Sequence, residues 1–322
     1  MNKSYLNFRT DMADERVDVY KRVHNLTDVD GVEVISDTND GVITTTVNVL
    51  NENGARAVSK EIGKYITMEI KDIQYLDEES KKDITLQVAN QIQVLVGKDK
   101  TKSILVVGLG NVYVTPDSLG PKVIEKLEVT RHLINFAKDL VEPNTRSVSG
   151  ISPGVLGTTG IETSEIITSI SKDLKPDIVI VIDSLASQSV HRVGSTIQLS
   201  NTGITPGAGV KNKRAGINEQ VLNVPVIAIG VPTVVDMATI TNEAIDKMLD
   251  NTKEKLNNFE NTNIDRNDIN KVIDFLEEDN RYNMIANVLD TENYIVTPKE
   301  IDEVIDSVAD IISSSINYAL QN

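Results

Sequence analysis

Apolar residues follow a strand-like period in the first third of the chain. Residues 32–35 and 42–50 are β-rich and flank the turn residues SDTNDG, so they predict a hairpin. Residues 65–70 alternate like a further strand, and residues 79–96 carry apolar side chains at helical spacing. Residues 1–30 show no strong period, and NENGAR (51–56) is interpreted as a turn. The pattern predicts a β-rich subregion at 30–75.

The middle of the chain changes to short, unbroken apolar runs. Such runs occupy residues 104–110, 177–185 and 224–231, and helical patterns cover 121–140 and 163–174. Unbroken Val/Ile runs are typical of strands buried on both faces, and intervening helices are typical of parallel crossovers. We therefore predict the α/β class, with a central, mostly parallel sheet covered by helices on both faces and a core at 100–241.

The C-terminal part is predominantly helical in pattern. Residues 242–290 are charged and Asn-rich, and the tail from 296 is amphipathic, with Thr297 as the expected N-cap and Pro298 at the first helical position. No internal repeat or long linker interrupts the sequence. We expect one domain, 1–322, that ends in a helical part at 242–322.

Composition excludes several classes of function. The chain carries 48 acidic and 32 basic residues, a formal net charge of -16, which argues against direct binding to nucleic acid or anionic membranes. It has no cysteine, so disulfides, thiolate metal sites and a cysteine nucleophile are absent. No run of 18 apolar residues and no signal-peptide pattern occurs, so we expect a cytoplasmic protein.

The loop GLGNVYVTPDSLGP (108–121) follows the first central strand and starts like a nucleotide-binding loop. A dinucleotide fingerprint needs a third glycine where this chain has Tyr113, and no GxxxxGK[ST] motif occurs. A non-catalytic nucleotide-binding module stays open as an alternative. Asp117, in the same loop, has two interpretations: a helix cap, or a carboxylate held ionised beside a helix terminus.

Asp183 is the second candidate, because it follows the apolar run 178–182 and is expected at the C-terminal tip of that strand. Open α/β sheets place their sites at the carboxyl ends of strands. Adjacent strands would bring Asp117 and Asp183 within reach of each other. Two close carboxylates can share a proton, so that one acts as base and the other as acid.

Three glycine-rich stretches, at 149–163, 201–214 and 230–236, are predicted at the same end of the sheet. Such loops let a ligand approach the backbone and offer N–H donors. The candidate substrate-binding residues are Gly154, Gly157, Gly207, Gly209 and the basic group Lys211, Lys213 and Arg214. On an acidic protein, that basic group suggests attraction of a carboxylate.

Other chemistries have weaker support. The stretch DSLASQSVH holds three serines and His191, but it lacks the G-x-S-x-G elbow of serine hydrolases. Asp117, Asp183 and His191 together offer ligands for a divalent ion, at a spacing that is not diagnostic. A metal-assisted hydrolase therefore stays open as an alternative, although we expect no metal and no cofactor.

Long, irregular blocks of the sequence resemble the germination proteases of spore-forming bacteria. They include FRTDMADE (8–15), GLGNVYVTPDSLGP (108–121), GISPGVLGTTGIET (150–163), IDSLASQSVHRV (182–193), IQLSNTGITPGAGVKNKR (197–214), VPVIAIGVPTVVD (224–236) and VTPKEIDEVI (296–305). The resemblance implies an atypical aspartic endopeptidase that degrades small acid-soluble spore proteins in the spore core, with a core fold similar to that of hydrogenase maturation proteases.

The resemblance also implies the catalytic residues, the oligomeric state and the maturation of the enzyme. The family's two aspartates fall on Asp117 and Asp183, and its enzymes are tetrameric zymogens that mature by clipping an N-terminal propeptide. Here only about seven residues precede FRTDM, so we expect a short propeptide at 1–7. From its place beside a helix start, Asp117 is the expected base, and Asp183 is the expected proton donor.

Overall fold

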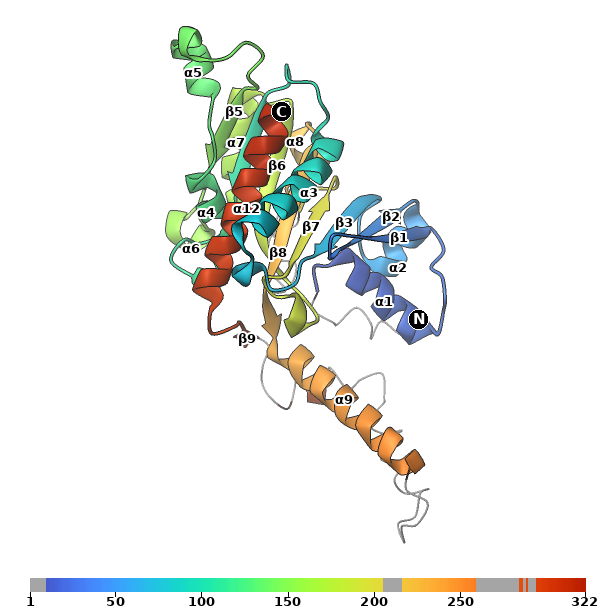
Figure 1. Cartoon of the computed structure of the whole chain (residues 1–322). Coiled ribbons are helices and arrows are strands. Elements are labelled where there is room, and N and C mark those ends of the chain that lie inside the picture. Colours follow the sequence, from blue (N-terminus) through green and yellow to red (C-terminus); the bar gives the residue numbers. More distant parts are fainter. Residues whose placement is uncertain (1–9, 205–215, 259–283, 286–287, 289–293) are drawn as a thin grey trace.

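A computed structural model describes residues 10–204, 216–258, 284–285, 288 and 294–322. It is built on one nine-stranded sheet in the order β1-β2-β3-β7-β8-β6-β4-β5, with β9 paired to β8 (Figure 1). The strands are β1 (Val32–Asn39), β2 (Val42–Val49), β3 (Gly63–Glu69), β4 (Ile104–Gly108), β5 (Val148–Ile151), β6 (Ile178–Ala186), β7 (Thr196–Ser200), β8 (Val226–Asp236) and β9 (Ile295–Val296).

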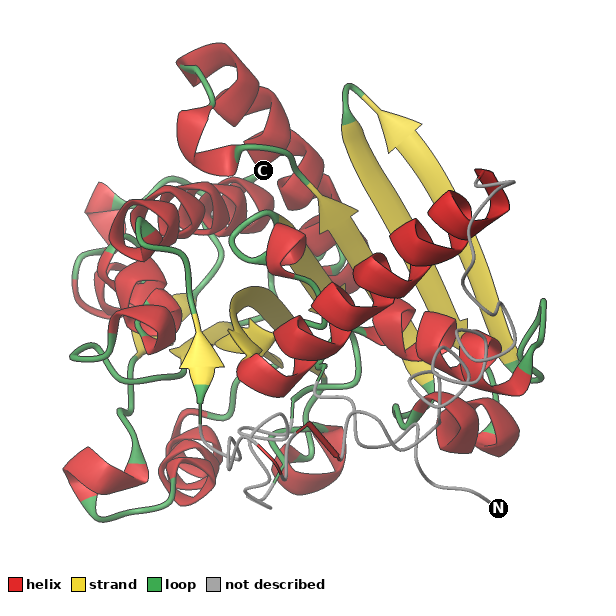
Figure 2. Ribbon diagram, turned by 90° about the horizontal axis from the view of Figure 1, so that it is seen from below, coloured by secondary structure: helices red, strands yellow, loops and turns green. Residues whose placement is uncertain are grey.

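The four strands β8, β6, β4 and β5 pair in parallel. The unbroken apolar runs predict the first three, whereas β5 was not predicted and overlaps the glycine-rich stretch 149–163. The predicted hairpin is also confirmed as β1 and β2, but its turn is shorter than predicted, because the residues SDTN (36–39) belong to β1. It does not form a separate layer, because β3 pairs with β7 and β7 with β8, all antiparallel. The sheet as a whole is therefore mixed, with the N-terminal strands at one end, as Figures 1 and 2 show.

Helices and helical turns connect these strands. The helices are α1 (Ala13–His24), α2 (Glu52–Val58), α3 (Glu78–Val96), α4 (Leu119–Glu125), α5 (Arg131–Phe136), α6 (Leu156–Thr159), α7 (Thr163–Leu174), α8 (Glu219–Leu222), α9 (Met237–Asn258) and α12 (Ile301–Gln321). The 3-10 turns are η2 (Ile73–Tyr75), η3 (Thr115–Asp117), η4 (Lys138–Leu140) and η5 (Val190–Arg192).

Helices cover both faces of the parallel strands, which confirms the predicted α/β architecture. On one face α3, α4 and α12 form a large apolar core with alternate residues of β4 and β6, such as Val106 and Ile180. On the other face α7 and α8 cover the intervening residues, such as Val107 and Val181. The helix α1 packs separately on β2 and β3. Burial of both faces explains why these strands lack polar alternation.

One helix was not predicted and two local predictions are wrong. Residues 13–24 form α1, whose apolar face packs on the sheet although its sequence period is weak. NENGAR is not a turn, because the Asn51 side chain accepts the N–H groups of Asn53 and Gly54 and so caps α2. The helix expected over 121–140 is broken after Glu125 and resumes as α5. The cause of the break lies in α12, described below.

The C-terminal helix starts later than its sequence predicts. Its N-cap is Glu300 rather than Thr297, and the first helical residue is Ile301. Residues 295–296 instead pair with the end of β8 as β9, and the Thr297 hydroxyl donates to the Thr233 carbonyl at 2.9 Å. The residues that resemble a helix start are therefore used in a strand pairing and a tertiary hydrogen bond instead.

Candidate active site

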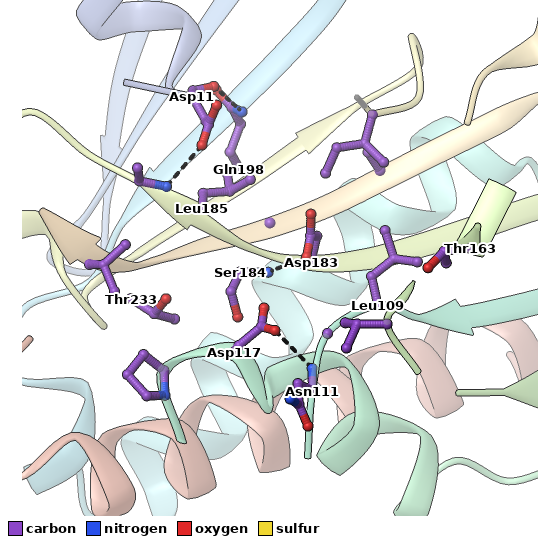
Figure 3. Close-up of a pocket in the computed structure, with 18 of the residues that line it drawn as sticks. Asp11, Leu109, Asn111, Asp117, Thr163, Asp183, Ser184, Leu185, Gln198 and Thr233 are labelled. Atoms are coloured by element: carbon purple, nitrogen blue, oxygen red, sulfur yellow. Dashed lines mark hydrogen bonds between the residues drawn. The ribbon is translucent and has the colours of Figure 1, made fainter. Parts of the chain in front are cut away.

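A pocket of about 460 Å³ lies where the C-terminal ends of β4, β6 and β8 meet. Asp117 and Asp183 both line it, and Figure 3 shows them entering from different elements, Asp117 from η3 and Asp183 from β6. Their meeting follows from the register, because β4 and β6 are neighbours and Gly108 pairs with Ile182. The structure therefore brings together two acids that are 66 positions apart in the sequence (183 − 117).

Asp117 is not the N-cap of α4. That position is Ser118, whose side chain makes no capping hydrogen bond. The Asp117 carboxylate instead turns back into its own loop, where Oδ2 accepts the Asn111 N–H at 2.9 Å. The Asp117 carbonyl also accepts that N–H, at 3.0 Å. These two hydrogen bonds tie both the carboxylate and the backbone of Asp117 to the start of the same loop.

The glycines of this loop serve packing. A β-carbon on Gly108 would lie 2.2 Å from the Gly120 carbonyl oxygen, and one on Gly110 would lie 1.9 Å from that of Asp117. Gly110 also has a φ of +115°, which side-chain-bearing residues rarely adopt. Both glycines thus let η3 and α4 sit directly on the end of β4, and this contact fixes the position of Asp117.

Asp183 lies inside β6, three residues before the strand ends at Ala186, and not at its tip as predicted. It pairs with Gly230 of β8, is buried, and accepts the Ser184 N–H on Oδ1 at 2.9 Å. By strand alternation its side chain shares a face with Val181, toward α7. Asp117 precedes α4, which packs on the opposite face, so the two residues reach the pocket from elements on different sides of the sheet.

A third pocket carboxylate, Asp11, was missed by sequence reasoning. Its N–H donates to the Ala186 carbonyl and its Oδ2 accepts the Ala186 N–H, both at 2.9 Å. Its carbonyl accepts from Lys60 Nζ at 2.6 Å and from Gln198 Nε2 at 3.3 Å. The N-terminal segment is therefore pinned across the end of the strand that carries Asp183 (Figure 3). The block FRTDMADE was the only sequence signal for it.

A buried charge cluster continues from this segment. Arg192 of η5 pairs with three carboxylates. Its Nη1 lies 2.7 Å from Asp14 Oδ2 and 3.6 Å from Glu15 Oε1, and its Nη2 lies 2.5 Å from Glu69 Oε1. Glu15 Oε2 also accepts the Gln188 N–H at 2.8 Å and the Thr10 hydroxyl. Burial raises the pKa of Glu15 to about 7, against the opposing effects of Thr10 and Arg192. The cluster joins α1 to the connection between the pocket strands β6 and β7.

The predicted substrate-binding glycines divide into three groups. Gly154 lines the pocket, together with Gly203 and Gly230 of the other two glycine-rich stretches. Gly157 lies exposed in α6 and does not line it. The remaining predicted residues, Gly207, Gly209, Lys211, Lys213 and Arg214, lie outside the described part of the chain.

The structure gives little support to a metal-assisted or a serine-based mechanism. In the described ranges, no three His, Cys, Asp or Glu side chains are grouped as metal ligands, and His191 is an exposed residue of η5 that does not line the pocket. The hydroxyl of Ser187 donates to the Ser189 carbonyl, so this serine is engaged outside the pocket. Among the described helices, none is long and apolar enough to cross a membrane.

Comparison with known proteins agrees with the resemblance drawn from the sequence. Residues 9–264 match the family model described as germination protease. The chain is 46% identical over 321 residues to the germination protease of Clostridium tetani, covering 98% of this chain and 96% of that protein. It is also 39% identical over 344 residues to that of Bacillus cytotoxicus, with 98% and 94% coverage.

Among solved structures, a [NiFe] hydrogenase maturation protease, HycI from Thermococcus kodakarensis, aligns over 72% of this chain and 99% of its own, with 15% identity and a TM-score of 0.35. The family model covers well over half of the chain, and the match to the relative from Clostridium tetani covers nearly all of it. The chain belongs to the germination protease family and is an endopeptidase.

Proposed function

We propose that the protein initiates degradation of small acid-soluble spore proteins, with Asp117 and Asp183 as its catalytic pair. The observation that carries the proposal is that both carboxylates line one pocket at the carboxyl ends of adjacent parallel strands. Sites of open α/β sheets lie at this position. The family supports a protease acting on a spore protein.

In the proposed reaction, Asp117 accepts a proton from a water molecule as the water oxygen attacks the scissile carbonyl carbon. The carbonyl π-electron pair moves onto its oxygen, and backbone N–H groups in 149–160 or 203–210 stabilise the resulting oxyanion. Collapse of this intermediate breaks the C–N bond, and Asp183 gives its proton to the leaving amine. The Asp117–Asn111 hydrogen bond supports this role by holding the carboxylate in a fixed position in its loop.

The substrate class and life history of the enzyme are part of the same proposal. An acidic stretch of the substrate would be attracted to Lys211, Lys213 and Arg214, while Gly154 and its neighbours would contact the peptide backbone. We also propose a zymogen with a short propeptide at 1–7, which lies outside the described residues, and a homotetramer in the spore core. The family assignment supports these points.

The test is cleavage of a purified small acid-soluble spore protein by Asp117→Asn, Asp183→Asn and the control Asp173→Asn, an exposed aspartate of α7. Circular dichroism first establishes that each variant folds. Loss of an acid–base group lowers the rate about 100- to 10,000-fold, so both pocket variants are expected to lose at least about 100-fold in kcat. Wild-type activity in either folded pocket variant would reject the pair.

A further inference from the structure

The turn that carries Asp117 is held between the sheet and the C-terminal helix. On one side, Gly108 and Gly110 allow the backbone of η3 and α4 to lie in direct contact with the end of β4. On the other side, Leu119 and Val123 of α4 are fully buried in the core cluster that contains Ile305 and Val308 of α12. Because α4 begins two residues after Asp117, the placement of α4 also sets the placement of this carboxylate.

Two ion pairs fix α4 on α12. Lys122 Nζ lies 2.6 Å from Asp306 Oδ1, and four residues further on in each segment Lys126, the C-cap of α4, pairs with Asp310. The two pairs have the same four-residue spacing on both segments, and we call them the ion-pair ladder. The ladder opposes movement of α4 along the axis of α12. Exposed ion pairs contribute little to folding stability, so the protein is expected to fold when one pair of the ladder is changed.

Asn317 of α12 defines where α4 ends. Its Oδ1 accepts the Glu128 N–H at 2.9 Å, and its Nδ2 donates to the Lys126 carbonyl at 3.2 Å. One amide therefore satisfies two backbone groups beyond the helix end, at the point where the sequence predicts an uninterrupted helix. With the ladder at its middle and this clamp at its end, α4 is attached to α12 along its whole length.

We propose that α12 is a positioning element of the active site, acting on Asp117 through the Lys122–Asp306 and Lys126–Asp310 ladder. The inference rests on the proposed role of Asp117, and it concerns a helix that lies beyond the residues matched by the family model. A displacement of about 1 Å at a reacting group can cost up to 100-fold in rate, so a modest slip of α4 is enough to lower kcat. None of the ladder residues lines the pocket, so substrate affinity is not expected to change.

The experiment reverses the charge of one residue in the Lys122–Asp306 pair and then re-forms the pair with the two charges exchanged. Asp306→Lys places two cations together, and we expect kcat to fall roughly three- to ten-fold with KM within two-fold of wild type. The double variant Lys122→Asp with Asp306→Lys re-forms the pair with its charges exchanged and should recover most of the loss. The matched control is Asp302→Lys, one turn earlier on α12, where an exposed aspartate has no ion pair among the described residues.

A readout other than activity accompanies the kinetics. Amide hydrogen exchange of residues 111–118 should be faster in Asp306→Lys than in Asp302→Lys and slow again in the exchanged pair. Unchanged kcat and exchange in folded Asp306→Lys would overturn the inference, as would an equal loss in the control or no recovery in the double variant. If Asp306→Lys does not fold, Asp306→Asn, which removes the charge without repulsion, gives the same comparison. Failure of the proposed function would appear separately, as full activity of Asp117→Asn.

Discussion

Gly110 and Asp117 are in direct backbone contact: a β-carbon at Gly110 would lie 1.9 Å from the carbonyl oxygen of Asp117. The same loop closes a second time through the Asn111 N–H, which donates to the Asp117 carboxylate. A glycine loop that resembles a phosphate-binding motif in sequence is thus used to seat an acidic residue. This contact makes the placement of Asp117 sensitive to a single methyl group.

We therefore expect Gly110→Ala to lower both activity and stability. The added β-carbon meets backbone that cannot move aside without shifting Asp117, and a φ of +115° is strained for alanine. The free energy of unfolding should fall by about 1–3 kcal/mol, and kcat by at least about ten-fold. Urea unfolding and substrate cleavage measure the two effects.

Gly157→Ala is the control for that variant. A β-carbon on Gly157 would meet nothing within 4 Å, and this glycine has no positive φ. Its unfolding free energy should stay within about 0.5 kcal/mol of wild type, or rise slightly, because alanine favours a helix. Equal behaviour of the two glycine variants would contradict the packing role of Gly110.

The Glu15 carboxyl should make stability depend on pH. Its pKa rises from an ordinary 4.5 to about 7 on folding because of burial, so between these values the folded protein binds more protons than the unfolded chain. The stabilisation by this group is therefore complete below pH 4.5 and is lost as pH rises to 7, by up to about 1.4 kcal/mol per pH unit.

Glu15→Gln removes this titration while it keeps a similar side chain. Urea unfolding of both proteins between pH 4.5 and 8 should show the variant gaining stability relative to wild type as pH rises. A constant difference between the two curves would mean that Glu15 does not titrate in this range.

Arg192→Met should destabilise the protein strongly near pH 8. It leaves the buried carboxylates of Asp14 and Glu15, and the half-buried carboxylate of Glu69, without their cation. Breaking such a pair costs about 3–5 kcal/mol. The loss should be smaller at pH 5, where Glu15 is protonated. Thermal unfolding at both pH values measures this, with Lys247→Met, from an exposed pair in α9, expected to change little.

Chelation distinguishes the proposed carboxylate pair from a metal-assisted hydrolase. Three aspartates line the pocket, but among the described residues no His, Cys, Asp or Glu side chains form a group of three that could hold a metal ion, so we expect activity to survive dialysis against EDTA. The measurement is the cleavage rate before and after treatment. Lasting loss of activity that a divalent ion restores would favour the metal mechanism.

Much of the fold could be read from local patterns. The hairpin at β1 and β2, the buried runs at β4, β6 and β8 and the helices α3 and α7 all appear where periodicity predicts them. These elements obey short-range rules, because burial on one face or two leaves a period in the sequence. Two of the wrong predictions involve distant partners, Asn317, which ends α4, and Thr233, which bonds Thr297, whereas the missed start of α2 is a local cap by Asn51.

The sequence alone determined the α/β class, the buried strands and the candidacy of Asp117 and Asp183, because strand ends and turn residues are local features. Tertiary structure decided that both acids line one pocket, that Asp11 joins them and that Gly110 seats Asp117. It also decided that the N-terminal hairpin extends the main sheet. These relationships depend on which strands become neighbours, and strand order is set by the burial of the whole chain rather than by any one segment.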